Sequence, residues 1–181
     1  EALTNQGGLG MLTALAVVLV YIALRFQMKF AIGAVVALFH DVIIILGVFS
    51  ITRWDFDLTV LAALLSVIGY SLTDTTVVAD RIRENFRLVR RGTSLEIINT
   101  SLNQTLGRTV VTSLTTLLVL VTLYLLGGEL IRGFAVGLII GVLVGTYSSV
   151  YIAANVMILL KISKEDLAIP IKEGADDPDM M

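Results

Sequence analysis

Long apolar runs separated by short polar links dominate the chain. Five of these runs are long enough to cross the roughly 30 Å core of a bilayer as helices that rise about 1.5 Å per residue. They are too long for barrel strands, and they lack the alternation that such strands show. The pattern predicts an all-α membrane protein, a polytopic bundle within residues 1–163, whose transmembrane helices lie at about 8–24, 30–50, 58–78, 109–126 and 133–160.

The longest polar link, residues 79–108, combines basic residues with a helical stripe. Leu95, Ile98 and Leu102 recur at helical spacing along it. We therefore expect a cytoplasmic amphipathic link, which either lies in the membrane interface or forms an ordinary surface helix. Residues 164–181 carry both prolines of the chain and several acids, and they are predicted to form a disordered cytoplasmic tail.

Composition supports the membrane assignment and narrows the chemistry. The chain is 56% hydrophobic and 15% charged, with a mean hydropathy of +0.91. A soluble chain of this length could not bury that much apolar surface. The chain has no cysteine and one histidine, and it lacks the GxxxxGK[ST] and HExxH motifs. We therefore expect no metal, no cofactor and no enzymatic activity.

Lysine and arginine concentrate on one side of the predicted bundle. Eleven of these residues fall in the links and tail of one side, and two fall on the other. By the positive-inside rule, the long link and the C-terminus are cytoplasmic and the N-terminus lies outside. An odd number of spans puts the ends on opposite sides. If the full protein starts in the cytoplasm, at least one earlier span is missing from this chain.

Asp74 and Arg108 are charges at the mouths of the third and fourth predicted spans. A charge within a bilayer costs at least about 2.5–3.5 kcal/mol on insertion scales, so such residues generally face protein and mark ion paths or relays. Desolvation favours a neutral carboxyl and a nearby guanidinium favours a charged one, so an acid held between them could bind and release a proton. The alternatives for Asp74 are a static ion pair or a hydrogen-bonded acid that fixes helix packing. Those for Arg108 are snorkelling to the inner surface or an ordinary positive-inside residue.

Polar positions recur at helical spacing around both charges. The face of the third span contains Ser66, Tyr70, Thr73, Asp74 and Val77. The face of the fourth span contains Arg108, Thr112 and Thr116. We expect these two faces to meet, so that the threonines support the charged pair through hydrogen bonds.

His40 and Asp41 lie in the middle of the second predicted span. Adjacent residues do not share a helix face, so a simple pair is not expected. Two interpretations stay open. The residues act as a relay or supporting partner for Asp74, or they form interhelical hydrogen bonds that order the bundle.

Small residues occupy every fourth position of the fifth predicted span. They are Gly133, Gly137, Gly141, Gly145, Ser149 and Ala153. Such a stripe lets another helix approach closely. Packing within the same bundle is favoured over an interface between copies, and the spacing does not identify the partner helix.

Several long strings of this sequence resemble a known family. FHDVIIILGVFSI, IGYSLTDTTVVADRIRENFR and SLNQTLGRTVVTSLTTL are similar to the C-terminal membrane half of SecF, a member of the RND superfamily, and the resemblance runs from Asn5 to Ser163. It implies one half of a pseudo-symmetric bundle shared with SecD in the bacterial inner membrane. It also implies contact with lipids, the SecYEG channel, other translocon subunits and the preprotein substrate, but not with nucleic acid.

The resemblance also implies a function for the charged pair. The family's membrane acid falls on Asp74 and its membrane arginine on Arg108, so the implied role is proton-motive-force-driven assistance to preprotein translocation. One position departs from the family, because Thr73 stands where Asn often precedes the acid. The expected coupling ion is the proton, since one carboxylate with neighbouring hydroxyls gives sodium too few oxygen ligands. The alternatives are a proton-coupled exporter of small molecules or lipids, and a scaffold of the translocon that transports nothing.

Overall fold

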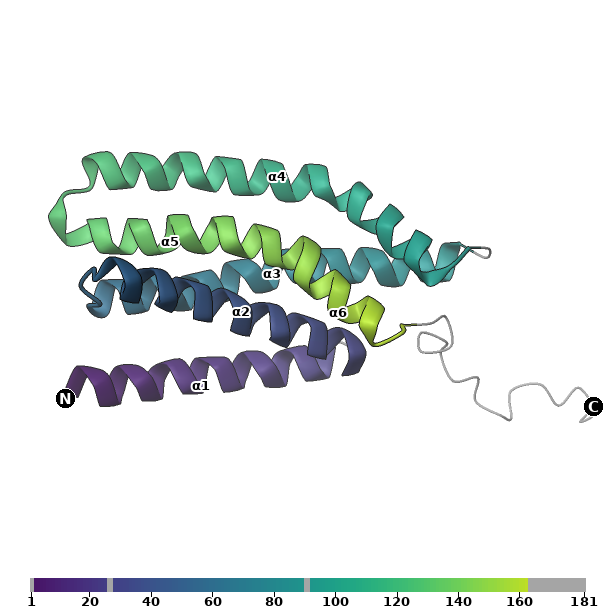
Figure 1. The fold of residues 1–181 in the computed structure, drawn as a ribbon, viewed down its shortest axis with the longest axis horizontal. Coiled ribbons are helices and arrows are strands. Elements are labelled where there is room, and N and C mark those ends of the chain that lie inside the picture. Colours follow the sequence, from purple (N-terminus) through teal and green to yellow (C-terminus); the bar gives the residue numbers. More distant parts are fainter. Residues whose placement is uncertain (1, 26–27, 90–91, 163–181) are drawn as a thin grey trace, which may run out of the picture.

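The computed structural model describes residues 2–25, 28–89 and 92–162. Within these ranges the chain consists of helices joined by short links, with no strand, which confirms the predicted all-α bundle. The helices run alongside one another, and α5 lies between α4 and the α2–α3 pair (Figure 1). The predicted disordered tail, 164–181, lies outside the described residues.

The bundle contains five long helical segments, the last of which is interrupted. In chain order the elements are α1 (Ala2–Arg25), α2 (Met28–Thr52), α3 (Leu58–Leu88), α4 (Ser94–Leu126), α5 (Glu129–Tyr147), the π-helix η1 (Ser148–Ile152) and α6 (Ala153–Leu159). Four segments are long and apolar enough to cross a membrane: α2, α3, α4 and the continuous stretch Glu129–Leu159. The first predicted span falls in α1, which carries a shorter apolar run, Gly7–Ile22.

The predicted link 79–108 is shared between two long helices. Helix α3 continues past Val78 to Leu88, and α4 begins at Ser94 and runs without interruption to Leu126. Hydropathy predicts where a span leaves the apolar core, but it does not require the helix to stop there.

A capping box sets the start of α4. The Thr93 backbone N–H donates to Glu96 Oε2 at 2.9 Å, and the Glu96 N–H donates to Thr93 Oγ1 at 3.3 Å. Reciprocal bonds of this kind satisfy two backbone donors that a helix start would otherwise leave free. Gly92, with φ +127°, provides the preceding turn in a conformation that residues with a side chain rarely adopt.

Asp57 fixes the start of α3. Its Oδ1 accepts hydrogen bonds from Thr59 Oγ1 at 2.7 Å and from the Val60 N–H at 2.9 Å. These two donors stabilise the charged form, so they hold the pKa of the Asp57 carboxyl below its usual range. The cap fixes the point at which the chain turns back into the bundle after α2.

Helix α3 lies at the centre of the bundle and packs most extensively against α5. The glycine stripe of α5 faces α3. A methyl group placed on Gly137 would lie 3.0 Å from Ala63 Cβ, and one placed on Gly145 would lie 3.3 Å from Ser71 Cβ. Gly133 similarly faces Val60, and Gly141 lies directly against Val67. The close approach therefore occurs within one chain, between α5 and α3.

Helix α4 has the least buried apolar stretch of the four helices that are long and apolar enough to cross a membrane. Only 17% of its most apolar stretch is buried, against 50% for α3. Leu114, Leu118, Val119 and Leu125 point outwards on its exposed surface. An apolar surface of this kind suits lipid or another membrane helix.

Candidate functional site

Asp74 lies on the buried face of α3, with only 8% of the residue exposed. In the described part of the chain no group hydrogen-bonds to its Oδ2, nor to the hydroxyls of Thr75 and Thr109. Most buried polar atoms in proteins have a partner, so such atoms commonly mark functional positions. This carboxyl oxygen is therefore available to bind a proton.

The register of two antiparallel helices places Thr109 of α4 near the level of Asp74. Tyr70 Oη of α3 lies 3.1 Å from Ser113 Oγ of α4. Further along α3, Asn85 Nδ2 donates to Ser101 Oγ of α4 at 2.8 Å. Asp74 and Thr109 lie between these two contacts on their respective helices. The unpartnered oxygens of Asp74 and Thr109 therefore lie in one region of the α3–α4 interface.

Arg108 lies at this interface but on its exposed side. Its guanidinium attracts the Asp74 carboxylate through Coulombic interaction. Within the described ranges no ion pair shorter than 4 Å joins the two side chains; nearby pairs such as Arg81–Glu84 form along α3 instead. Arg108 lines a groove of about 390 Å³ that also contains acidic Asp80 and Glu84. Asp74 and Arg108, the two predicted relay residues, thus interact electrostatically without forming an ion pair.

The predicted inward face of α4 was wrong by one position. The buried polar residues of this helix include Thr105, Thr109 and Ser113. Thr112 and Thr116 instead donate to carbonyl oxygens of their own helix, those of Arg108 and Thr112, at 3.0 and 2.8 Å. Hydroxyl residues lie all around this part of α4, so two adjacent faces of the helix both show polar residues spaced by four. Only the packing of the helix determines which of these two faces is buried.

Thr73 likewise lies outside the interface. It is exposed, and its Oγ1 donates to the Gly69 carbonyl of its own helix at 2.9 Å. The residue before Asp74 therefore gives the carboxyl no hydrogen bond here.

Ser113 joins three helices near the site. Besides its contact with Tyr70, its Oγ lies 2.6 Å from Thr146 Oγ1 of α5. This chain of hydroxyls crosses from α3 through α4 to α5. These contacts attach α4 to both α3 and α5 at Ser113.

Asp41 is the most extensively hydrogen-bonded carboxylate within the described bundle. Only 2% of the residue is exposed. Its Oδ2 accepts hydrogen bonds from Ser71 Oγ of α3 at 2.5 Å and from Ser148 Oγ of η1 at 2.8 Å. Three segments therefore meet at this one side chain of α2. A buried acid within a membrane-spanning helix costs free energy, and such acids generally face the bundle interior and pair with other groups, as Asp41 does.

His40 and Asp41 interact, although neighbouring residues were not expected to pair. His40 Nδ1 lies 3.2 Å from Asp41 Oδ1. The prediction considered only helix faces, whereas an imidazole turned sideways brings Nδ1 to the carboxylate of the next residue. His40 is only partly buried, so it forms the outer edge of this cluster.

The π-helix η1 is a feature that the sequence analysis missed. It begins at Ser148, the same residue that donates to Asp41. π-helical turns are rare and occur frequently at functional sites. The available signal was the pair of adjacent serines, Ser148 and Ser149, in an apolar span, of which only Ser149 belongs to the stripe of small residues.

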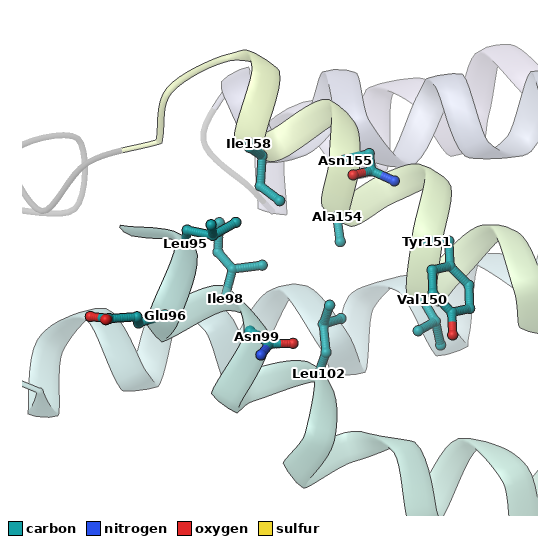
Figure 2. A pocket seen from close by; sticks show the side chains of 10 residues that line it. All are labelled: Leu95, Glu96, Ile98, Asn99, Leu102, Val150, Tyr151, Ala154, Asn155 and Ile158. Atoms are coloured by element: carbon teal, nitrogen blue, oxygen red, sulfur yellow. The ribbon is translucent and has the colours of Figure 1, made fainter. Parts of the chain in front are cut away.

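A second groove opens where the start of α4 approaches η1 and α6 (Figure 2). Leu102 and Val150 approach each other across it, and Asn99 and Asn155 contribute the polar groups. Glu96 is its only charged lining residue, and its side chain points away from the centre. Among the described residues no cluster of His, Asp or Glu could hold a metal ion.

The sequence matches one protein family over nearly its whole length. Residues 1–163 match the family model for protein export membrane protein SecD/SecF, C-terminal. The chain is 52% identical over 178 residues to the protein translocase subunit SecF of Pseudomonas aeruginosa, which covers 98% of this chain and 58% of that protein. It is 49% identical over 181 residues to SecF of Escherichia coli O157:H7, covering 99% and 56% respectively. The chain thus spans somewhat more than half of these relatives.

Two solved structures have the same fold. A crystal structure of SecDF, a translocon-associated membrane protein from Thermus thermophilus, matches with a TM-score of 0.85 and 43% identity over 89% of this chain and 22% of that one. A crystal structure of SecDF in a super-membrane-facing form matches with a TM-score of 0.77 and 45% identity, over 81% and 20%. These values support an equivalent arrangement of the helices.

Proposed function

The chain belongs to the SecD/SecF family of protein-export membrane proteins, and from this premise we propose that it uses the proton-motive force to assist preprotein translocation. Asp74 is the group that binds and releases the proton, and Arg108 is its mobile counter-charge. The role is that of a transport subunit without enzymatic activity. The observation that carries the proposal is the buried Asp74 carboxyl, which has an unpartnered oxygen inside a membrane-spanning helix.

The geometry supports a cycle in which charge controls the α3–α4 interface. When Asp74 is ionised, it attracts the Arg108 guanidinium, which does not yet contact it. When Asp74 is protonated, this attraction disappears. Because most of the apolar surface of α4 faces away from the bundle, a shift of α4 would have to change mainly its contacts with α3 and α5. The protonation state therefore sets the position of α4, and through it the movement of parts outside this chain.

The proposal also covers location and partners. We place the chain in the bacterial inner membrane with its C-terminus in the cytoplasm, as its excess of basic residues on that side favours. SecD is the proposed partner in the membrane, with the SecYEG channel and the preprotein beyond it. The outward apolar surface of α4 offers a contact area for such a helix or for lipid.

Proton-gradient-dependent translocation of a preprotein into inverted membrane vesicles tests this function. Full-length wild type is compared with Asp74→Asn and Arg108→Met at equal abundance of the complex. Arg132→Met is the matched control, because Arg132 is an exposed arginine in the first turn of α5, next to the ring of Tyr124 at the end of α4. Both site variants should retain only the translocation seen without a gradient, and the control should behave as wild type.

Two other results would replace the proposal. If translocation is unchanged in both variants, the charges are structural and a scaffold function is favoured. If the vesicles instead move a small molecule or lipid in a gradient-dependent and Asp74-dependent manner, while preprotein translocation is unaffected, the chain belongs to an exporter.

A further inference from the structure

The Asp41 cluster connects the helix that carries Asp74 to the only π-helical turn in the described chain. Ser71, which donates to Asp41, precedes Asp74 by three residues on the same buried face of α3. Ser148, the second donor, is the first residue of η1. One carboxylate therefore bridges the turn next to Asp74 and the point where the last membrane segment changes its helical pitch.

The hydrogen bonds to Asp41 have the geometry of a charged acceptor. Two hydroxyls donate to the same oxygen, and the distance to Ser71 Oγ, 2.5 Å, falls at the short end of the range for a hydroxyl bound to a carboxylate. Hydrogen bonds to an ionised carboxylate are roughly twice as strong as those to a neutral acceptor, so an amide at this position would hold the two serines more weakly.

Gly145 makes room for this bridge. A methyl group on Gly145 would lie 3.6 Å from Asp41 Oδ2 and 3.3 Å from Ser71 Cβ. Its Cα therefore faces the gap through which the carboxylate reaches α3. The small residue at this position brings α5 close to the cluster just before η1 begins.

We propose that Asp41 is a positioning residue of the proton-coupled cycle, which ties η1 to the turn of α3 that bears Asp74. This inference rests on the proposed function of Asp74. Three residues of helix correspond to a rise of about 4.5 Å, so the hydrogen bond from Ser71 to Asp41 lies about one turn of α3 away from Asp74. A movement of this part of α3 when Asp74 binds or releases its proton therefore reaches Asp41 through Ser71, and it reaches η1 through Ser148.

A change in η1 would alter the orientation of α6. A π-helical turn accommodates one extra residue, so a change between π and α pitch rotates the following helix by about 100° per residue. Helix α6 follows η1 directly and forms one wall of the groove against the start of α4 (Figure 2). The bridge at Asp41 would thereby convert proton binding in the membrane into a rotation of α6 against the start of α4.

These 181 residues contain no cysteine, so labels can be directed to chosen positions once any cysteines elsewhere in the complex have been replaced. We would attach spin labels to Leu88→Cys, at the end of α3, and to Leu159→Cys, at the end of α6. Double electron–electron resonance then reports the distance between the ends of the two helices. Both positions are exposed, at 67% and 78%. The labelled full-length protein is measured in its complex, with Asp74 intact and with Asp74→Asn as a mimic of the protonated state.

The expected result is a shift of the distance distribution on Asp74→Asn that is lost when Asp41→Asn or Ser148→Ala is also present. Ser148→Thr, which keeps the hydroxyl, should restore the shift. Ser66→Ala is the matched control, because Ser66 is exposed and donates only to the Ala62 carbonyl of its own helix. Asp41→Asn and Ser148→Ala should also reduce gradient-dependent translocation at equal abundance, and Ser66→Ala should not.

The outcomes separate the two proposals. If Asp74→Asn abolishes translocation but its distance shift persists in both the Asp41→Asn and Ser148→Ala backgrounds, the positioning role is overturned and the function of Asp74 stands. If Asp74→Asn changes neither the distance nor translocation, the proposed function fails and the positioning role fails with it.

Discussion

Gly141 of α5 lies against the side chain of Val67 of α3, and the space between them cannot take a methyl group. The two residues lie near the middle of the most extensive helix contact of the bundle. Close approach of backbones of this kind is the principal source of packing energy between membrane helices, since lipid is as apolar as the side chains.

Gly141→Ala should therefore destabilise the bundle. The added methyl overlaps Val67, and overpacking of this kind typically costs about 1–3 kcal/mol. Gly47→Ala is the matched control, because a methyl there would meet open space. Thermal unfolding in detergent should show a lower midpoint for the first variant and an unchanged or slightly higher midpoint for the second. Equal midpoints would contradict the assigned packing.

Tyr70→Phe should loosen α4 without creating a buried unpartnered group. The variant removes the hydroxyl that contacts Ser113, while Ser113 keeps its 2.6 Å contact with Thr146. We expect a loss of about 0.5–1.5 kcal/mol, the usual contribution of one hydrogen bond. The free energy of unfolding in detergent provides the check. Tyr21→Phe, on the exposed surface of α1, should have no effect, and a similar loss there would refute the assignment.

Asp57→Ala should weaken the start of α3. Loss of an N-cap carboxylate costs about 0.5–2 kcal/mol, and Asp55→Ala, an exposed acid in the same link, should cost little. Because the pKa of Asp57 is lowered by Thr59 and Val60, its charge adds stability that is present at neutral pH and is lost as the pH falls through that lowered pKa. Unfolding midpoints should thus differ between wild type and variant at pH 7 and converge in acid. If the difference in midpoint between wild type and Asp57→Ala instead grows as the pH falls, the prediction is wrong.

Much of the architecture is predictable from the sequence because a bilayer imposes simple rules. Apolar runs must be helical to satisfy their backbone groups, so the spans and the all-α class follow from hydropathy. The choice of Asp74 as a candidate site follows from the cost of a charge in lipid. The register of the glycine stripe also follows from the spacing, but the partner helix α3 does not, since any helix could fill that surface.

The details of the site depend on packing that no single helix encodes. The inward face of α4 contains Thr109 and Ser113, although Thr112 has the same chemistry one position away. The bridge from Asp41 to Ser148 joins residues separated by 107 positions, and only the folded bundle brings them together. The π-helical turn η1 cannot be predicted from the hydropathy pattern, because the span that contains it is apolar on all sides.

The most direct test of the central claim is whether the Asp74 carboxyl binds a proton in the membrane. Infrared difference spectra of the full-length complex, recorded across a pH titration, contain the carbonyl stretch of any carboxylic acid that becomes protonated. The account predicts a band in wild type that is absent in Asp74→Asn and unchanged in the control Asp55→Asn. A wild-type spectrum without such a band, or a band that persists unaltered in Asp74→Asn, would contradict it.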